Sequence, residues 1–119
     1  MEQEKKYELL KFVDGELEVE VNVSPKEETI WMSTEEIAIL YNIDRTGISR
    51  HIKNIYKNEE LEENSTCAKI AHMGSLNSQR YETKLYNLDV ILAVGYRVNT
   101  KKGTIFRKWA NKILKDYLM

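Results

Sequence analysis

The chain has 119 residues, of which 42% are hydrophobic and one, Cys67, is cysteine. This length suits one domain with a packed core, so bulk disorder is excluded. The single cysteine excludes an internal disulfide, and no apolar run approaches the roughly 18 residues of a membrane span. The charged first residues do not fit a signal peptide, so we expect a soluble, cytoplasmic protein with no membrane partner.

The formal net charge of -1 hides an uneven distribution. Residues 1–36 carry four basic and eleven acidic side chains, whereas residues 69–119 carry ten basic and three acidic ones. Between them, residues 37–58 carry four basic side chains and one acidic, and residues 59–68 carry four glutamates. This separation predicts that one face of the protein meets an anionic partner.

The N-terminal third reads as β-structure. Segments 7–13 and 16–23 flank Asp14-Gly15, a dipeptide typical of a two-residue hairpin turn. The second segment alternates apolar and polar residues, which predicts a strand with one buried face and one acidic face. A third short strand is predicted at 29–32.

Residues 33–57 form a candidate helix-turn-helix. Ser33 and Glu36 fit a capping box, in which each side chain bonds a backbone N–H of the other residue. A helix is predicted from there to about Tyr41, followed by a break at 42–43. A second helix is predicted over 45–57, with Asp44 as its N-cap.

The second of these helices has the side chains expected of a DNA-reading helix. Its isoleucines, Ile48, Ile52 and Ile55, fall on one side and predict the buried face. The opposite side carries residue types that read base edges or hold phosphates, namely Arg45, Thr46, Ser49, Arg50, Lys53, Asn54 and Lys57. We therefore expect this helix to enter the major groove of double-stranded DNA. An ordinary helical hairpin with a solvated basic face is the alternative interpretation.

A wing-like β-hairpin is predicted over residues 66–86. Its arms offer basic side chains for backbone or minor-groove contacts, namely Lys69, His72, Arg80 and Lys84. Among these we take Lys69 and Arg80 as candidate DNA-binding residues, although a hairpin that only covers the core would have the same sequence.

Two C-terminal helices are predicted, over 89–97 and 104–118. The second has an apolar stripe with helical spacing. Lys101 and Lys102 fall in the predicted loop before it, where free N–H groups of the helix also favour a phosphate. The chain ends within or just after this helix, so we expect it to be part of a longer protein. Residues 1–119 are thus expected to form a single DNA-binding domain of the α+β class.

Several segments closely resemble the RhuM family of bacterial virulence-associated proteins, over nearly the whole chain. They are Asp44–Ile55, Ser65–Lys69, Tyr86–Ile91, Val94–Asn99 and Gly103–Ala110. The C-terminal part is also similar to Bro-N domains of phage antirepressors. The resemblance implies a DNA-binding protein of pathogenicity islands or mobile elements, acting in transcription regulation.

Other chemistry has weaker support in the sequence. Cys67, His51 and His72 have no metal-ligand spacing, and no glycine-rich phosphate loop is present, so we expect no catalytic residue, metal, cofactor or small-molecule substrate. A single reading helix covers few base pairs, which favours a homodimer on a two-fold site. Two rival hypotheses remain. The chain could be a protein-interaction module attached to a further domain, or an enzyme using Cys67 with a histidine.

Overall fold

The computed structural model describes the backbone of residues 8–73 and 80–118 and the side chains of residues 8–70 and 82–116. Its strands are β1 (Glu8–Asp14), β2 (Leu17–Ser24), β3 (Thr29–Ser33), β4 (Cys67–Met73) and β5 (Arg80–Tyr86). Its helices are α1 (Thr34–Tyr41), α2 (Arg45–Lys57), α3 (Glu63–Thr66), α4 (Leu88–Val98) and α5 (Thr100–Leu118). Runs of strands alternate with runs of helices along the chain, the strands pair antiparallel, and the fold is α+β, as predicted.

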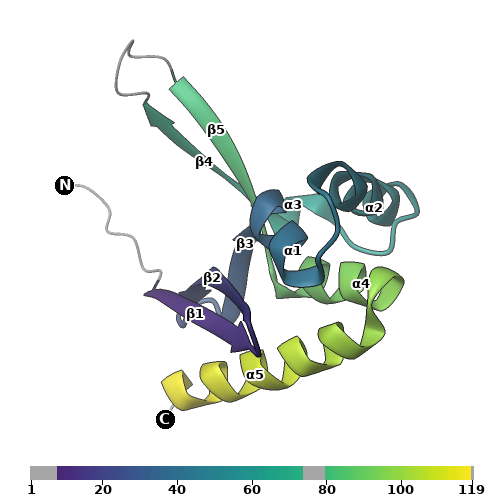
Figure 1. Cartoon of the computed structure of the whole chain (residues 1–119). Coiled ribbons are helices and arrows are strands. Elements are labelled where there is room, and N and C mark those ends of the chain that lie inside the picture. The colour runs from purple at the N-terminus through teal and green to yellow at the C-terminus, as the bar shows by residue number, and fades with distance from the viewer. Residues whose placement is uncertain (1–7, 74–79, 119) are drawn as a thin grey trace, which may run out of the picture.

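The strands form an antiparallel sheet in the order β1-β2-β3-β5-β4. Its two halves meet where β3 pairs with β5 through Met32–Tyr86 and Ser33–Leu85. In Figure 1 the β1–β2 half lies over α5, whereas the β4–β5 hairpin extends away from the body of the molecule. The hairpin therefore lies beside α1 and α2 and is joined to the rest of the sheet at one end.

The turn between β1 and β2 lies one residue later than predicted. Asp14 pairs with Leu17, so Gly15 and Glu16 form the two-residue loop in place of Asp14-Gly15. Gly15 has a φ of 67°, which favours glycine at the first loop position. The resulting register places Phe12 opposite Val19, and both side chains are buried.

An aromatic contact holds α5 against the sheet. The Phe12 ring packs edge-on against Phe106, with 5.0 Å between ring centroids, and against Trp109 at 5.2 Å. Phe106 and Ala110 are fully buried, as the apolar stripe of this helix predicted. These side chains belong to a hydrophobic cluster that also includes Ile37 of α1 and Val90 of α4.

The sequence predicts the N-cap hydrogen bonds of α1 correctly and those of α2 incorrectly. The capping box of α1 is confirmed, because Ser33 Oγ accepts from the Glu36 N–H while Glu36 Oε1 accepts from the Ser33 N–H. Asn42 ends α1 in the left-handed region. Asp44 occupies the N-cap position of α2, but the prediction that its side chain caps the helix is wrong, since it makes no such hydrogen bond.

The predicted loop before the last helix is also wrong. Helix α4 ends at Val98 and α5 begins at Thr100, so Lys101 and Lys102 lie in the first turn of α5. Asn99 makes this possible, because it ends α4 and its Oδ1 accepts a hydrogen bond from the Lys102 N–H. One residue thus serves both helix ends.

Gly103 lies at the contact between α4 and α5. It faces Gly95 of α4, and a Cβ built on Gly95 would lie 3.1 Å from the Gly103 Cα. The same Cβ would lie 2.8 Å from Tyr41 Cζ. The Tyr41 hydroxyl is buried there and donates to the Ile91 carbonyl over 2.7 Å. Small residues at this point therefore allow α1, α4 and α5 to approach closely.

The segment between α2 and the hairpin is more ordered than the acidic turn that the sequence predicts. Residues 63–66 form the short helix α3, so Thr66 ends this helix and β4 begins at Cys67. The predicted hairpin at 66–86 is otherwise present, with β4 and β5 paired from Cys67–Tyr86 to Met73–Arg80. Its predicted turn at 73–78 lies outside the described residues, apart from the backbone of Met73.

We predict opposite outcomes for alanine at the two contacting glycines. Gly95→Ala should lower the free energy of unfolding by about 1–3 kcal/mol, because its Cβ collides with the buried Tyr41 ring. In Gly103→Ala the new Cβ would keep ordinary contacts of 3.5 Å with Gly95. Higher helix propensity should then leave stability unchanged or raise it by up to about 1 kcal/mol. Urea unfolding followed by circular dichroism measures both, and equal losses would contradict the packing described.

Candidate nucleic-acid interface

Helix α2 has one buried side and one exposed side, as predicted. Ile48 and Ile55 are 0% exposed and Ile52 is 3% exposed. The α2 side chains predicted to contact DNA are all exposed, and they are Arg45, Thr46, Ser49, Arg50, Lys53, Asn54 and Lys57. The structure therefore places these seven candidates together on the outer surface of one helix.

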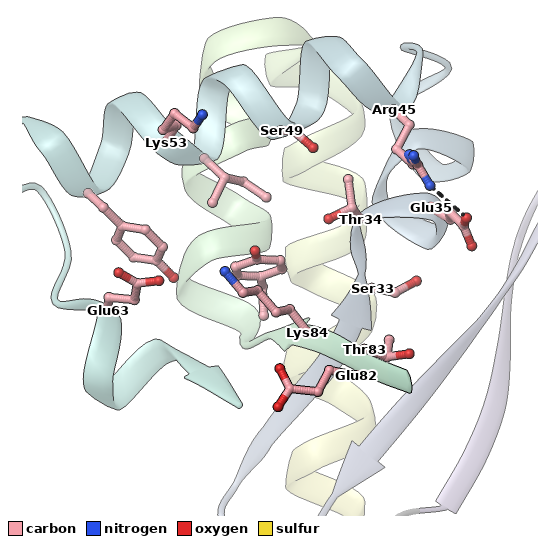
Figure 2. A pocket seen from close by; sticks show the side chains of 13 residues that line it. Ser33, Thr34, Glu35, Arg45, Ser49, Lys53, Glu63, Glu82, Thr83 and Lys84 are labelled. Carbon is pink, nitrogen blue, oxygen red and sulfur yellow. Dashed lines mark hydrogen bonds and ion pairs between the residues drawn. The ribbon is translucent and has the colours of Figure 1, made fainter. Parts of the chain in front are cut away.

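A groove of about 730 Å³ separates α2 from strand β5 (Figure 2). Arg45, Ser49 and Lys53, spaced four residues apart, line its α2 side. Its other lining residues are Ser33, Thr34, Glu35, Ile52, Tyr56, Glu63, Glu82, Thr83, Lys84 and Tyr86. The exposed side of α2 is thus divided: Thr46, Arg50, Asn54 and Lys57 do not line the groove, and helical geometry places them further round the helix.

Some charged side chains of the groove form ion pairs and others do not. Arg45 forms an ion pair with Glu35 over 3.1 Å, and both side chains are largely exposed, so the pair contributes little to stability. In the part of the chain that the structure describes, Lys53 and Lys84 have no ion pair. Figure 2 shows the Glu82 carboxylate pointing away from α2. Cationic groups of both walls are therefore available to an anion.

The hairpin candidates are only partly described. Lys69 is exposed on β4 and is the direct cross-strand partner of Lys84. Arg80 begins β5, and its side chain lies outside the described residues, as does that of His72.

The two candidate lysines of α5 do not line the groove. Lys102 forms an ion pair with Asp14, which joins the first turn of α5 to the β1–β2 hairpin. Its side chain is 20% exposed. Lys101 is exposed in the same turn. The structure thus gives Lys102 a contact within the fold and separates both lysines from the predicted α2 surface.

Sequence reasoning missed the aromatic and acidic parts of the groove. Tyr56, Tyr86 and Glu63 line it, and none was among the predicted site residues. A usable signal was present for Tyr86, because residues 82, 84 and 86 alternate along β5 and therefore share one face. No comparable signal existed for Tyr56 and Glu63, whose place depends on how α3 follows α2.

Cys67 has the character of a packed thiol. It lies opposite Tyr86, it is half-buried, and burial raises the pKa of its thiol. The nearby Lys84 and Lys69 ammonium groups oppose that increase in pKa, and Glu63 adds to it. Because the thiolate is the nucleophile, a raised pKa does not favour covalent catalysis at this position.

No group of three or more His, Cys, Asp or Glu side chains among the described residues could hold a metal ion. No helix within the described ranges is long and apolar enough to cross a membrane.

The class of the molecule is thus an α+β domain with a paired α1–α2 unit beside a β-hairpin. Residues 65–119 match the family model described as Virulence protein RhuM family. The matched segment runs from the end of α3 through β4, β5, α4 and α5. Searches of curated proteins and of solved structures found no match.

We predict that Tyr86 makes the protein sensitive to alkali. Burial raises the pKa of Tyr86 from 10.0 to about 12, so the folded protein favours the neutral phenol. The resulting stabilisation is complete below pH 10.0 and is lost as the pH rises toward about 12. Burial also raises the pKa of Tyr41, so Tyr86→Phe should abolish only part of this loss.

Urea unfolding at a series of pH values tests the alkaline sensitivity. The fall in unfolding free energy above pH 10.0 should be smaller for Tyr86→Phe than for wild type. Identical pH dependence of the two proteins would contradict the prediction.

Proposed function

We propose that the chain binds double-stranded DNA through a winged helix-turn-helix made of α1, α2 and the β4–β5 hairpin. One observation carries the proposal. Helix α2 buries its isoleucines and exposes a continuous surface of basic, hydroxyl and amide side chains, with no acidic residue from Arg45 to Asn58. Such a surface suits a polyanion whose base edges offer hydrogen-bond donors and acceptors.

The dimensions and neighbours of α2 support this use. An α-helix with side chains is about 10–12 Å wide, and the major groove of B-DNA is about 12 Å wide. Strand β3 precedes α1, and β5 pairs with β3, so the β4–β5 hairpin lies beside α2. DNA bound to α2 would therefore pass next to the hairpin. In Figure 1, α2 and the hairpin lie on the side of the molecule away from α5.

The exposed residues of α2 divide into two roles in this proposal. Arg50 and Asn54 read bases, because arginine pairs well with guanine and asparagine with adenine. Arg45, Lys53 and Lys57 hold phosphates on either side. Thr46 and Ser49 have short side chains that suit either a base edge or a phosphate. Arg45 must leave Glu35 to do this, at little cost for so exposed an ion pair.

The family match gives the proposal a biological setting. We infer that the whole chain is a RhuM family protein that regulates transcription in a mobile element or pathogenicity island. Similarity of its C-terminal part to Bro-N domains of phage antirepressors belongs to the same proposal. A DNA-binding regulator of this kind would act in the cytoplasm as a homodimer on a two-fold site, without catalytic residue, metal or cofactor.

A protein-interaction module is the second candidate, and one observation favours it. The outer face of β1–β2 exposes Leu9 (64%) and Val13 (54%), with Glu18 and Glu20 on the same face of β2. Lys11 lies between Leu9 and Val13 on this face and pairs with Glu18 over 3.5 Å, so exposed apolar side chains alternate with both signs of charge. Such a surface suits an amphipathic partner segment. This surface does not overlap α2, so both functions can coexist in one molecule.

We predict that removing two cations from α2 weakens duplex binding and its salt dependence together. Fluorescence anisotropy of a mixed-sequence duplex pool, titrated at several salt concentrations, measures both. Arg50→Ala/Lys53→Ala should bind more weakly than wild type. It should also lose up to about two units from the slope of log affinity against log salt.

A matched control removes the same charge from α5. Arg107 and Lys108 are exposed on that helix, at the other end of the molecule from the hairpin (Figure 1). Arg107→Ala/Lys108→Ala should bind duplex DNA as wild type does. If the α2 and α5 variants lose affinity equally, or if wild type does not bind, α2 is not a DNA-reading helix.

A further inference from the structure

Two lysines lie directly opposite each other on the β4–β5 hairpin. Lys69 of β4 is the register partner of Lys84 of β5. Direct partners in an antiparallel pair project from the same face, with Cβ atoms about 4.5–5.5 Å apart. Like charges in that position destabilise the hairpin, and an anion bound between them would remove that repulsion.

The neighbours of this lysine pair do not neutralise it. Both side chains are exposed, and neither has an ion pair within the described part of the chain. Cys67 and Tyr86 form the adjacent pair on the same face, and Glu82 points away from α2 in Figure 2. Glu63 and Glu82 line the same groove, but among the described residues neither forms an ion pair with these lysines, so both ammonium groups are open to a bound anion.

The lysine pair shares its face of the hairpin with the groove beside α2. Lys84 lines the groove and extends from β5 into it, and Lys53 lines the opposite wall from α2 (Figure 2). Lys69 adjoins Lys84 through the strand pairing. Two ammonium groups, one from α2 and one from β5, thus line one groove, and the ammonium of Lys69 on β4 lies next to that of Lys84. This arrangement suits the negatively charged backbone of a single DNA strand.

We infer that Lys69 and Lys84 bind a backbone phosphate of the DNA strand that borders the major groove occupied by α2. The inference rests on the proposed function and identifies a contact from the hairpin rather than from α2. Lysine suits it, because its ammonium is a compact charge with three donors that can turn toward a phosphate oxygen. The contact carries no sequence information, so it contributes affinity and fixes the orientation of the protein on the duplex.

Glu63 limits the length of DNA strand that the groove can hold. Its carboxylate lines the groove (Figure 2) and would repel a second phosphate there. The phosphate site therefore consists of the lysine pair and Lys53, and it ends where α3 begins. Glu63→Gln should consequently strengthen duplex binding while Lys69→Gln/Lys84→Gln weakens it.

The test compares Lys69→Gln/Lys84→Gln with wild type by anisotropy at several salt concentrations, using two duplexes of unrelated sequence. We expect the salt slope to fall by about one to two units and the affinity to fall by the same factor for both duplexes. The free variant should melt at the same temperature as wild type or higher, because the like-charge pair is gone. The matched control is Lys108→Gln/Lys112→Gln on α5, which should leave the slope unchanged.

The outcomes separate this inference from the proposed function. If Arg50→Ala/Lys53→Ala loses binding while the hairpin variant keeps the wild-type slope, the phosphate site is rejected and the role of α2 stands. If the hairpin variant loses affinity for one duplex only, the lysines read sequence and the inference is wrong. If wild type binds no duplex at any salt concentration, both proposals are rejected together.

Discussion

The burial of one side of α2 fixes the surface that the protein presents. Ile48, Ile52 and Ile55 are packed into the core, and each contributes about 1.5–3 kcal/mol relative to an exposed position. Rotating the helix about its axis would expose these side chains and bury charged ones, at a cost beyond the stability of a small domain. The outward direction of Arg50 and Lys53 is therefore a consequence of packing rather than of any contact that they make themselves.

A second constraint holds the hairpin relative to α2. Thr66 is buried between them, and its Oγ1 lies 2.9 Å from the Tyr56 hydroxyl of α2 while it donates to the Glu62 carbonyl. The Thr66 carbonyl also accepts from the Asn87 N–H, directly after β5. One residue thus joins the end of α2, the start of β4 and the end of β5. The width of the groove depends on this junction, since β5 meets β3 at only two residue pairs.

The sequence predicts correctly those features that depend on residues close together in the chain. The helical period of α2 and the capping box at Ser33 depend on residues within a few positions, and both predictions are confirmed. The loop predicted before the last helix is wrong, because Gly103 lies within α5. Its role depends on Gly95, which lies on another helix. The groove was beyond prediction for the same reason, since Tyr56, Glu63 and Tyr86 meet only after α3 has turned the chain.

A net charge of -1 is compatible with DNA binding only if the acidic and basic groups are kept apart. The fold keeps the acidic strands β1 and β2 apart from α2 and the hairpin, because those strands pack over the basic helix α5, where Lys102 pairs with Asp14 (Figure 1). Within the α2 region the separation is incomplete, since Glu35 engages Arg45 and Glu63 borders the groove. Carboxylates at those places weaken the attraction to any duplex, regardless of its sequence. The contribution of base contacts by α2 to total affinity is then relatively larger, which favours specific over non-specific sites.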